Sequence, residues 1–319
     1  MQWLVQKNMI KKFQVFGLLI ASMLTTSIAF GAPYYVGAKK CNECHEAEYK
    51  VWEGSKHFQS FREAHKTPEA TKIATAMGGG DMKTNATCAI CHYTLEQKDE
   101  QSKPVARAGT SCESCHSPAS EWITVHNDYG GKNVKKEDET SQHRKDRIAA
   151  AQKLGMLWPT ATYDLASRCM ACHGLARSEI DGATLAKMLD AKHPFKPDYE
   201  WVRYSQGTVR HRFYPPAITD NSEMTPAEIS RWFIIGQAAK LVSATAAMNK
   251  SDHPAYKEGQ KKRAELARAG LSAVKDVPEV AALLADPSET NARKLTAAIE
   301  KQDLSAKVKS LLPAKDSYK

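Results

Sequence analysis

Residues 112–116 read Cys-Glu-Ser-Cys-His, and the same spacing of two cysteines and a histidine occurs three more times in the chain. The four strings are Cys41/Cys44/His45, Cys88/Cys91/His92, Cys112/Cys115/His116 and Cys169/Cys172/His173. They use all eight cysteines of the 319 residues. Only about 0.007 such strings are expected by chance at this composition, so the repetition reflects a chemical requirement.

The spacing within each string has a mechanical explanation. Two thiols three residues apart lie on one face of a helical turn, where both can add to the vinyl groups of one porphyrin. Zinc is an alternative, but each string would need a fourth ligand from elsewhere, and disulfides would not explain the histidine after every pair. The sequence therefore predicts four c-type haems, covalently bound through the eight cysteines. The proximal iron ligands are then His45, His92, His116 and His173.

Seven histidines remain for the second axial position of the irons. The distal candidates are His57, His126, His211 and His193, and the expected surface residues are His65, His143 and His253. His57 follows His45 by 12 residues in a helix-favouring segment, residues 46–65, which would separate the two by roughly 18 Å. Two ligands of one iron hold their nitrogens only about 4 Å apart. His57 therefore serves a different haem unless the chain bends sharply at Gly54.

The assignment of the other distal ligands stays open at this level. His126 follows His116 by ten residues, but Pro118 favours a turn between them, so crossing to another haem is not decided. Methionine ligands are an option, although the surplus of histidines makes them unnecessary. A second imidazole would make an iron low-spin and six-coordinate, as suits electron transfer, whereas a vacant position would admit a substrate.

The first 31 residues read as a secretory signal peptide. Residues 1–12 carry three lysines and no acidic residue, and a mostly apolar stretch with small residues at its end follows. An uncleaved anchor is the alternative, but polar residues dilute the apolar stretch below a comfortable membrane span. No later stretch has the roughly 18 uninterrupted apolar residues that a span needs. We expect a periplasmic protein without a transmembrane segment in its mature form.

The net charge of +9 does not by itself predict a nucleic-acid partner. Three of the lysines lie in the leader, and four haems would add about eight propionate charges, which brings the holoprotein near neutrality. We therefore expect redox proteins as donor and acceptor, and no nucleic acid. Peripheral contact with a membrane quinol oxidase is left open.

Helical patterns dominate the C-terminal part of the chain. The run Thr225-Pro226-Ala227-Glu228 is a capping-box start with proline at the first helical position. Further helices are predicted over residues 255–274, 278–285 and 289–300, and the tail after Leu312 is predicted to be loose.

The expected fold is mainly α, with loops that wrap the haems and little regular sheet. A small hairpin around residues 93–95 and 105–107 is the strand pair that the pattern favours. We divide the chain into a signal peptide (1–31), a tetrahaem cytochrome domain (32–220) and a helical C-terminal extension (221–319). The extension is expected to bury its apolar face against the haem domain.

Three haem segments resemble those of a known family, the tetrahaem cytochromes of the cytochrome c-554 type. The family's first haem segment is similar to Gly37-Ala38-Lys39-Lys40-Cys41 with Trp52, Ser55 and His57 beyond it. Its third is similar to Cys112-Glu113-Ser114-Cys115-His116 with His126 beyond, and its fourth to Ser167-Arg168-Cys169 up to His173. The resemblance covers roughly residues 35–215.

The resemblance implies closely packed haem pairs with crossed histidine ligands, in a protein that accepts electrons from hydroxylamine oxidoreductase. His57 and His126 match family ligand positions. A late histidine also serves as a ligand in the family, and His211 fits that place better than His193. The family's second haem lacks a sixth ligand, and its counterpart here is the haem on the second string, which ends at His92.

Two functional hypotheses follow. The leading one is a periplasmic electron carrier in which no residue is catalytic. The alternative is a haem enzyme with one open iron, a nitrogen-oxide or hydroxylamine oxidoreductase acting on nitric oxide, hydroxylamine or nitrite. A high-spin haem that binds carbon monoxide would distinguish the enzyme from the carrier.

Overall fold

The computed structural model describes residues 32–215 and 217–319, so the expected signal peptide at residues 1–31 lies outside the described residues. The helices are α2 (Ala38–Asn42), α3 (Glu46–Glu53), α4 (Lys56–Glu63), α5 (Pro68–Ala76), α6 (Ala86–His92), α7 (Cys112–His116), α8 (Ser141–Lys153), α9 (Thr162–His173), α10 (Gly182–Asp190), α11 (Trp201–Ser205), α12 (Pro226–Ala247), α13 (Pro254–Ser272), α14 (Pro278–Ala285), α15 (Glu289–Ala298) and α16 (Ser305–Val308). Two strands, β1 (Tyr93–Glu96) and β2 (Val105–Gly109), accompany them. The fold is mainly α, as predicted, and residues 33–319 form one compact unit.

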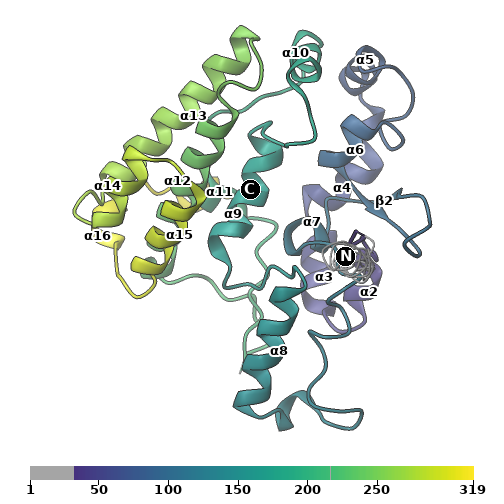
Figure 1. Cartoon of the computed structure of the whole chain (residues 1–319), viewed down its shortest axis with the longest axis vertical. Helices are drawn as coiled ribbons and strands as arrows, with labels where there is room; N and C mark the ends of the chain where they lie inside the picture. Colours follow the sequence, from purple (N-terminus) through teal and green to yellow (C-terminus); the bar gives the residue numbers. More distant parts are fainter. Residues whose placement is uncertain (1–31, 216) are drawn as a thin grey trace, which may run out of the picture. The chain divides into compact units, whose positions relative to one another are not determined.

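The two strands form the predicted hairpin. They pair antiparallel, with Tyr93 opposite Gly109 and Glu96 opposite Val105. Gly109 is needed for close packing, because a Cβ at this position would overlap the backbone carbonyl of His57 on α4. The hairpin joins α6 to α7, and it therefore holds the second and third Cys-x-x-Cys-His strings near each other (Figure 1).

The helix-favouring segment over residues 46–65 is interrupted after α3, at Gly54. Ser55 is fully buried and caps α4, because its hydroxyl accepts a hydrogen bond from the Phe58 backbone N–H at 3.2 Å. The same hydroxyl donates to the Trp52 carbonyl at 2.6 Å. The bend that the sequence left open is therefore present, and it sets the direction of α4, which carries His57.

The C-terminal extension shares its core with the helix of the fourth string. The capping box at Thr225 and Glu228 is present, and α13, α14 and α15 lie close to their predicted ranges. Apolar residues of α9, α12 and α13 form one buried cluster that includes Met170, Ile234 and Leu271. In the part of the chain that the structure describes, no helix has both the length and the apolar character to span a membrane.

The tail after Leu312 is docked, so the prediction of a loose end was wrong. The backbone N–H of Lys319 donates to the Arg203 carbonyl, and the Lys319 carbonyl accepts from the Thr208 N–H, both at 3.0 Å. These bonds hold the segment that leads to His211. A short polar tail has no hydrophobic period, and its partners are distant in sequence, so no local pattern could indicate the contact.

Candidate functional site

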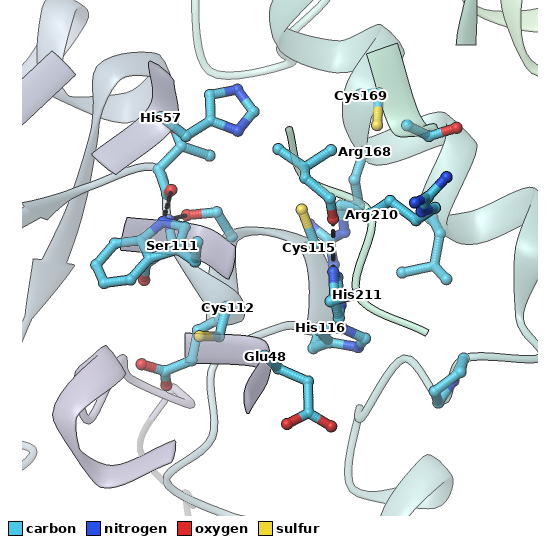
Figure 2. A pocket seen from close by; sticks show the side chains of 18 of the residues that line it. Glu48, His57, Ser111, Cys112, Cys115, His116, Arg168, Cys169, Arg210 and His211 are labelled. Carbon is cyan, nitrogen blue, oxygen red and sulfur yellow. Dashed lines mark hydrogen bonds between the residues drawn. The ribbon is translucent and has the colours of Figure 1, made fainter. Parts of the chain in front are cut away.

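All the cysteines and all eight candidate ligand histidines line one cavity of about 2880 Å³. A single small-molecule site occupies ~300–1,000 Å³, so this volume suits several large groups. Figure 2 shows one part of the wall, where Cys115 and His116 of α7 lie near Cys169 and His211. All eight thiols lie in the described ranges and are free, which does not agree with the disulfide alternative.

Each proximal histidine lies beside one distal candidate. The ring centres are separated by 6.3 Å for His45 and His126, 6.1 Å for His173 and His57, 6.1 Å for His92 and His193, and 6.2 Å for His116 and His211. Imidazoles on opposite sides of one metal, each with a nitrogen about 2 Å from it, have ring centres roughly 6.3 Å apart. The four separations therefore suit four sites with two histidines each.

The pairs cross between distant parts of the chain. His57 lies beside His173 of the fourth string, although His45 is nearer in sequence. His126 lies beside His45 of the first string, although His116 is nearer in sequence. Each of these two histidines therefore connects segments that carry different Cys-x-x-Cys-His strings. The late residue His193 is brought to the second string and His211 to the third.

Backbone carbonyls orient several of these rings. In four of them, Nδ1 forms a hydrogen bond with a backbone carbonyl oxygen. For His116 the partner is Leu157 at 2.8 Å, and for His126 it is Ile123 at 2.6 Å. For His193 the partner is Pro194 at 2.9 Å, and for His211 it is Val209 at 2.6 Å. A ring that donates from Nδ1 to a carbonyl leaves Nε2 unprotonated and available to a metal. The local backbone thus presents the nitrogen that iron would bind.

Burial keeps most of these histidines neutral. Desolvation lowers the pKa to about 4 for His92, His116 and His173, and it is the main cause of the lowered pKa of His57, His126 and His193. Neutral imidazole is the form that binds a metal. The rings are therefore ready for ligation near neutral pH.

Three arginine side chains on the cavity wall have a nitrogen without a partner. Among the described residues, the buried Nε of Arg177, Arg210 and Arg212 makes no hydrogen bond. Arg210 and Arg212 flank His211, and Arg212 also pairs with Glu228 at 2.7 Å. Buried donors require acceptors, and the propionate groups of a haem are anionic acceptors of the kind that arginine binds well. Thiols, paired imidazoles and these cations together fit c-type haem.

Contacts between cysteines indicate which sites are neighbours. The side chains of Cys41 and Cys112 lie close enough to affect each other's pKa, as do those of Cys91 and Cys172. Half-buried Cys115 of the third string interacts electrostatically with the cysteines of the fourth. The sites therefore follow one another in the order first, third, fourth, second.

Glu113 is a residue of the site whose role the sequence did not reveal. It stands within the third string and is 1% exposed, and its carboxylate accepts from the backbone N–H groups of Val36, Gly37 and Ala119 at 2.9, 2.7 and 2.8 Å. It thereby fixes the chain that precedes the first string to the third string. The only indication in the sequence was an acidic residue between the two cysteines. The sequence alone does not tell whether such a residue is buried or faces solvent.

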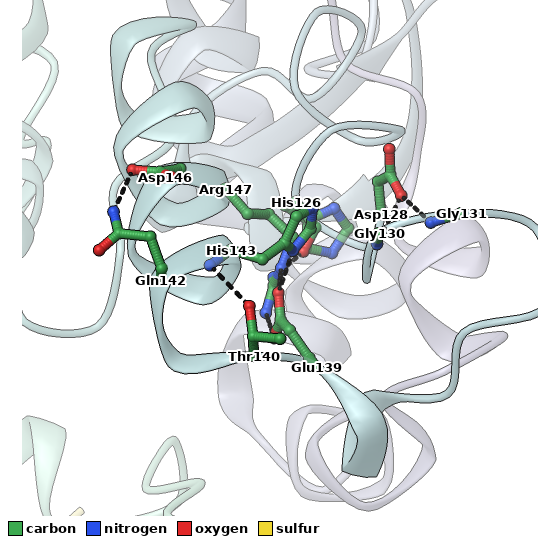
Figure 3. A network of polar contacts seen from close by, with 10 residues as sticks. All are labelled: His126, Asp128, Gly130, Gly131, Glu139, Thr140, Gln142, His143, Asp146 and Arg147. Carbon is green, nitrogen blue, oxygen red and sulfur yellow. Dashed lines mark hydrogen bonds and ion pairs between the residues drawn. The ribbon is translucent and has the colours of Figure 1, made fainter.

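A buried ion pair supports the segment that carries His126 (Figure 3). Arg147 on α8 donates to the two carboxylate oxygens of Glu139 at 2.6 Å each and also to the His126 carbonyl. The two charged side chains are 7% and 3% exposed. His143, which is partly exposed, contacts the same carboxylate at 2.8 Å. This pair anchors one of the predicted ligands of the first string.

Acidification is expected to weaken this support. Hydrogen bonds from Arg147 lower the pKa of Glu139 from 4.5 to about 2. A carboxyl group with a depressed pKa stabilises the fold fully above its unfolded pKa, and this contribution is lost as the pH falls through about 2. We expect Glu139→Gln to remove this part of the pH dependence in urea unfolding of the holoprotein measured at stepped pH. The exposed Glu137→Gln serves as control, and equal pH profiles for the two variants would contradict the prediction.

One of three comparisons with known proteins found a match. Residues 40–117 match the family model for cytochrome c554 and c-prime, and this stretch includes the first three Cys-x-x-Cys-His strings. A search of curated proteins and a search of solved structures each returned no significant match. Over residues 40–117 the chain therefore resembles c-type cytochromes of the cytochrome c-554 family, in which haem is bound covalently.

Proposed function

We propose that this cytochrome is a periplasmic tetrahaem electron carrier that exchanges electrons with redox proteins. The observation that carries the proposal is the pairing of every proximal histidine with a distal one at 6.1–6.3 Å. A bound haem supplies a one-electron iron couple. The cysteines would attach the four groups, and the paired imidazoles would hold each iron low-spin.

The arrangement of the sites supports electron transfer along the protein. The proximity of cysteines from different strings gives a continuous series of neighbouring sites. The first site lies at the surface, because Cys44 is exposed and the His45 side chain is 51% exposed. We propose that a donor or acceptor protein docks near this end. Peripheral association with a membrane quinol oxidase is one arrangement that would supply electrons there.

The enzyme alternative requires an iron with a vacant position. By resemblance to the family, the second site would be the open one. In this chain the ring centre of His193 lies 6.1 Å from that of His92, so a second imidazole is available to an iron bound there. This contact favours the carrier over an enzyme that acts on nitric oxide, hydroxylamine or nitrite.

The spin state of the oxidised holoprotein tests the proposal. We expect mass spectrometry to find four haems on each chain, electron paramagnetic resonance to detect low-spin iron alone, and carbon monoxide to leave the reduced spectrum unchanged. A high-spin component of one haem in four that shifts with carbon monoxide would contradict the carrier and support the enzyme. Fewer than four haems would contradict the tetrahaem assignment.

The proposed location rests on the leader at residues 1–31. Export would deliver the chain to the compartment where haem is attached to the cysteine thiols and where the proposed redox partners are found. The mass of the protein from a periplasmic fraction should match a chain that begins near residue 32. An intact leader, or recovery from the cytoplasm alone, would contradict the proposal.

A further inference from the structure

A buried cation lies directly behind the fourth haem motif. Arg263 on α13 is 1% exposed, and it is not among the described residues that line the cavity. Its guanidinium donates to Gln260 Oε1 at 2.6 Å, to Ser243 Oγ at 3.0 Å and, more weakly, to the carbonyl of Gly174 at 3.5 Å. Gly174 is the residue that follows His173, so the charge lies one residue from the proposed proximal ligand.

Glycine at position 174 makes this approach geometrically feasible. Its φ of −95° is open to any residue, so the backbone does not require glycine there. A Cβ at this position would instead overlap the Arg263 guanidinium. Two further side chains of α13 hold the same turn, because Gln260 Nε2 donates to Gly174 O at 2.9 Å and Tyr256 Oη donates to Leu175 O at 3.0 Å. Side chains of the C-terminal extension therefore hold the end of the fourth motif in place through hydrogen bonds.

The charge of Arg263 is not neutralised within the described part of the chain. All its hydrogen-bond acceptors there are uncharged. Lys240, the buried cation on α12, differs because Glu200 lies close enough to interact with its charge. Burial lowers the pKa of Arg263 to about 10, which leaves it positively charged at neutral pH. A buried charge without a counter-charge is costly, and the hydrogen bond to Gly174 does not need a cation.

We propose that Arg263 is a fixed positive charge that raises the reduction potential of the haem bound at Cys169 and Cys172. A cation in a region of low dielectric favours the form of a nearby redox group that carries one more electron. The position of Arg263 behind the cavity wall means that it acts through its field on the fourth site. The inference rests on the proposed tetrahaem function. It gives the C-terminal extension a role in setting the potential of this one haem.

A spectroelectrochemical titration of the holoprotein tests this role. We expect Arg263→Gln to shift one of the four one-electron components to a more negative potential and to leave the other three in place. Gln260→Glu, which is nearly isosteric, should shift the same component in the same direction because it places a carboxylate against the guanidinium. Arg263→Lys should restore a potential near that of the wild type. The control is Arg268→Gln, which removes an exposed charge from the same helix and should leave all four components unchanged.

The outcomes distinguish a charge effect from a packing effect. Equal shifts in Arg263→Gln and Arg263→Lys would overturn the proposal, as would an unchanged titration for Gln260→Glu. If Arg263→Gln does not fold, the Gln260→Glu result decides the question alone. Failure of the underlying tetrahaem proposal is visible separately, because the wild-type protein would then show fewer than four haems by mass spectrometry and fewer than four components.

Discussion

Replacement of His57 with alanine is expected to convert the fourth haem, and not the first, from low to high spin. The ring centre of His57, on α4, lies 6.1 Å from that of His173. Removal of the His57 imidazole would leave the iron of the fourth haem with one imidazole ligand. About one quarter of the iron should become high-spin and bind carbon monoxide, as measured by electron paramagnetic resonance and visible spectroscopy. This is the largest spectral change that we expect from any of the single substitutions proposed here.

Two comparisons make the assignment specific. His65→Ala changes a nearby histidine that does not line the cavity among the described residues, and it should leave all the iron low-spin. In a protein without the first haem, made by Cys41→Ser and Cys44→Ser, His57→Ala should still produce one high-spin iron. Loss of the high-spin signal in that background would assign His57 to the first haem and contradict the crossed pairing.

Replacement of Arg147 with methionine is expected to cause the largest loss of stability among these variants. It would leave the Glu139 carboxylate, 3% exposed, without its cation and would release the His126 carbonyl. Removal of one partner of a buried ion pair typically costs about 3–5 kcal/mol. Urea unfolding of the holoprotein measures the loss, and high-spin iron should accompany it if the His126 segment moves.

A double variant separates two effects of Arg147→Met, which are the loss of the ion pair and the cost of leaving the Glu139 carboxylate buried without a cation. Adding Glu139→Gln to Arg147→Met removes the uncompensated carboxylate and should recover part of the lost stability. Lys145→Met, an exposed change on the same helix, should alter the free energy of unfolding little. A loss for Arg147→Met no larger than that for Lys145→Met would show that the ion pair does not support the fold.

Local patterns predicted much of the secondary structure correctly. The capping box at Thr225 and the hairpin strand β1 depend on neighbouring residues, so they are readable from short stretches. The break at Gly54 was less certain, because its stability comes from the buried Ser55 cap. The docked tail was missed, because its hydrogen bonds join Lys319 to a segment that is more than 100 residues away.

The sequence by itself determined the attachment chemistry, because a thioether pair and its adjoining histidine need residues at fixed local spacing. It also supplied the family resemblance, which the match over residues 40–117 supports. Whether all four strings carry haem stays a prediction until the groups are counted.

The tertiary structure alone decided which distal histidine lies beside which proximal one, since His57 with His173 and His126 with His45 meet only through long-range folding. It also placed Glu113 and Arg147 on the wall of the cavity, and Arg263 behind the fourth string. Their importance comes from burial and hydrogen bonding to distant backbone groups, and neither property is encoded in the spacing of residues along the chain.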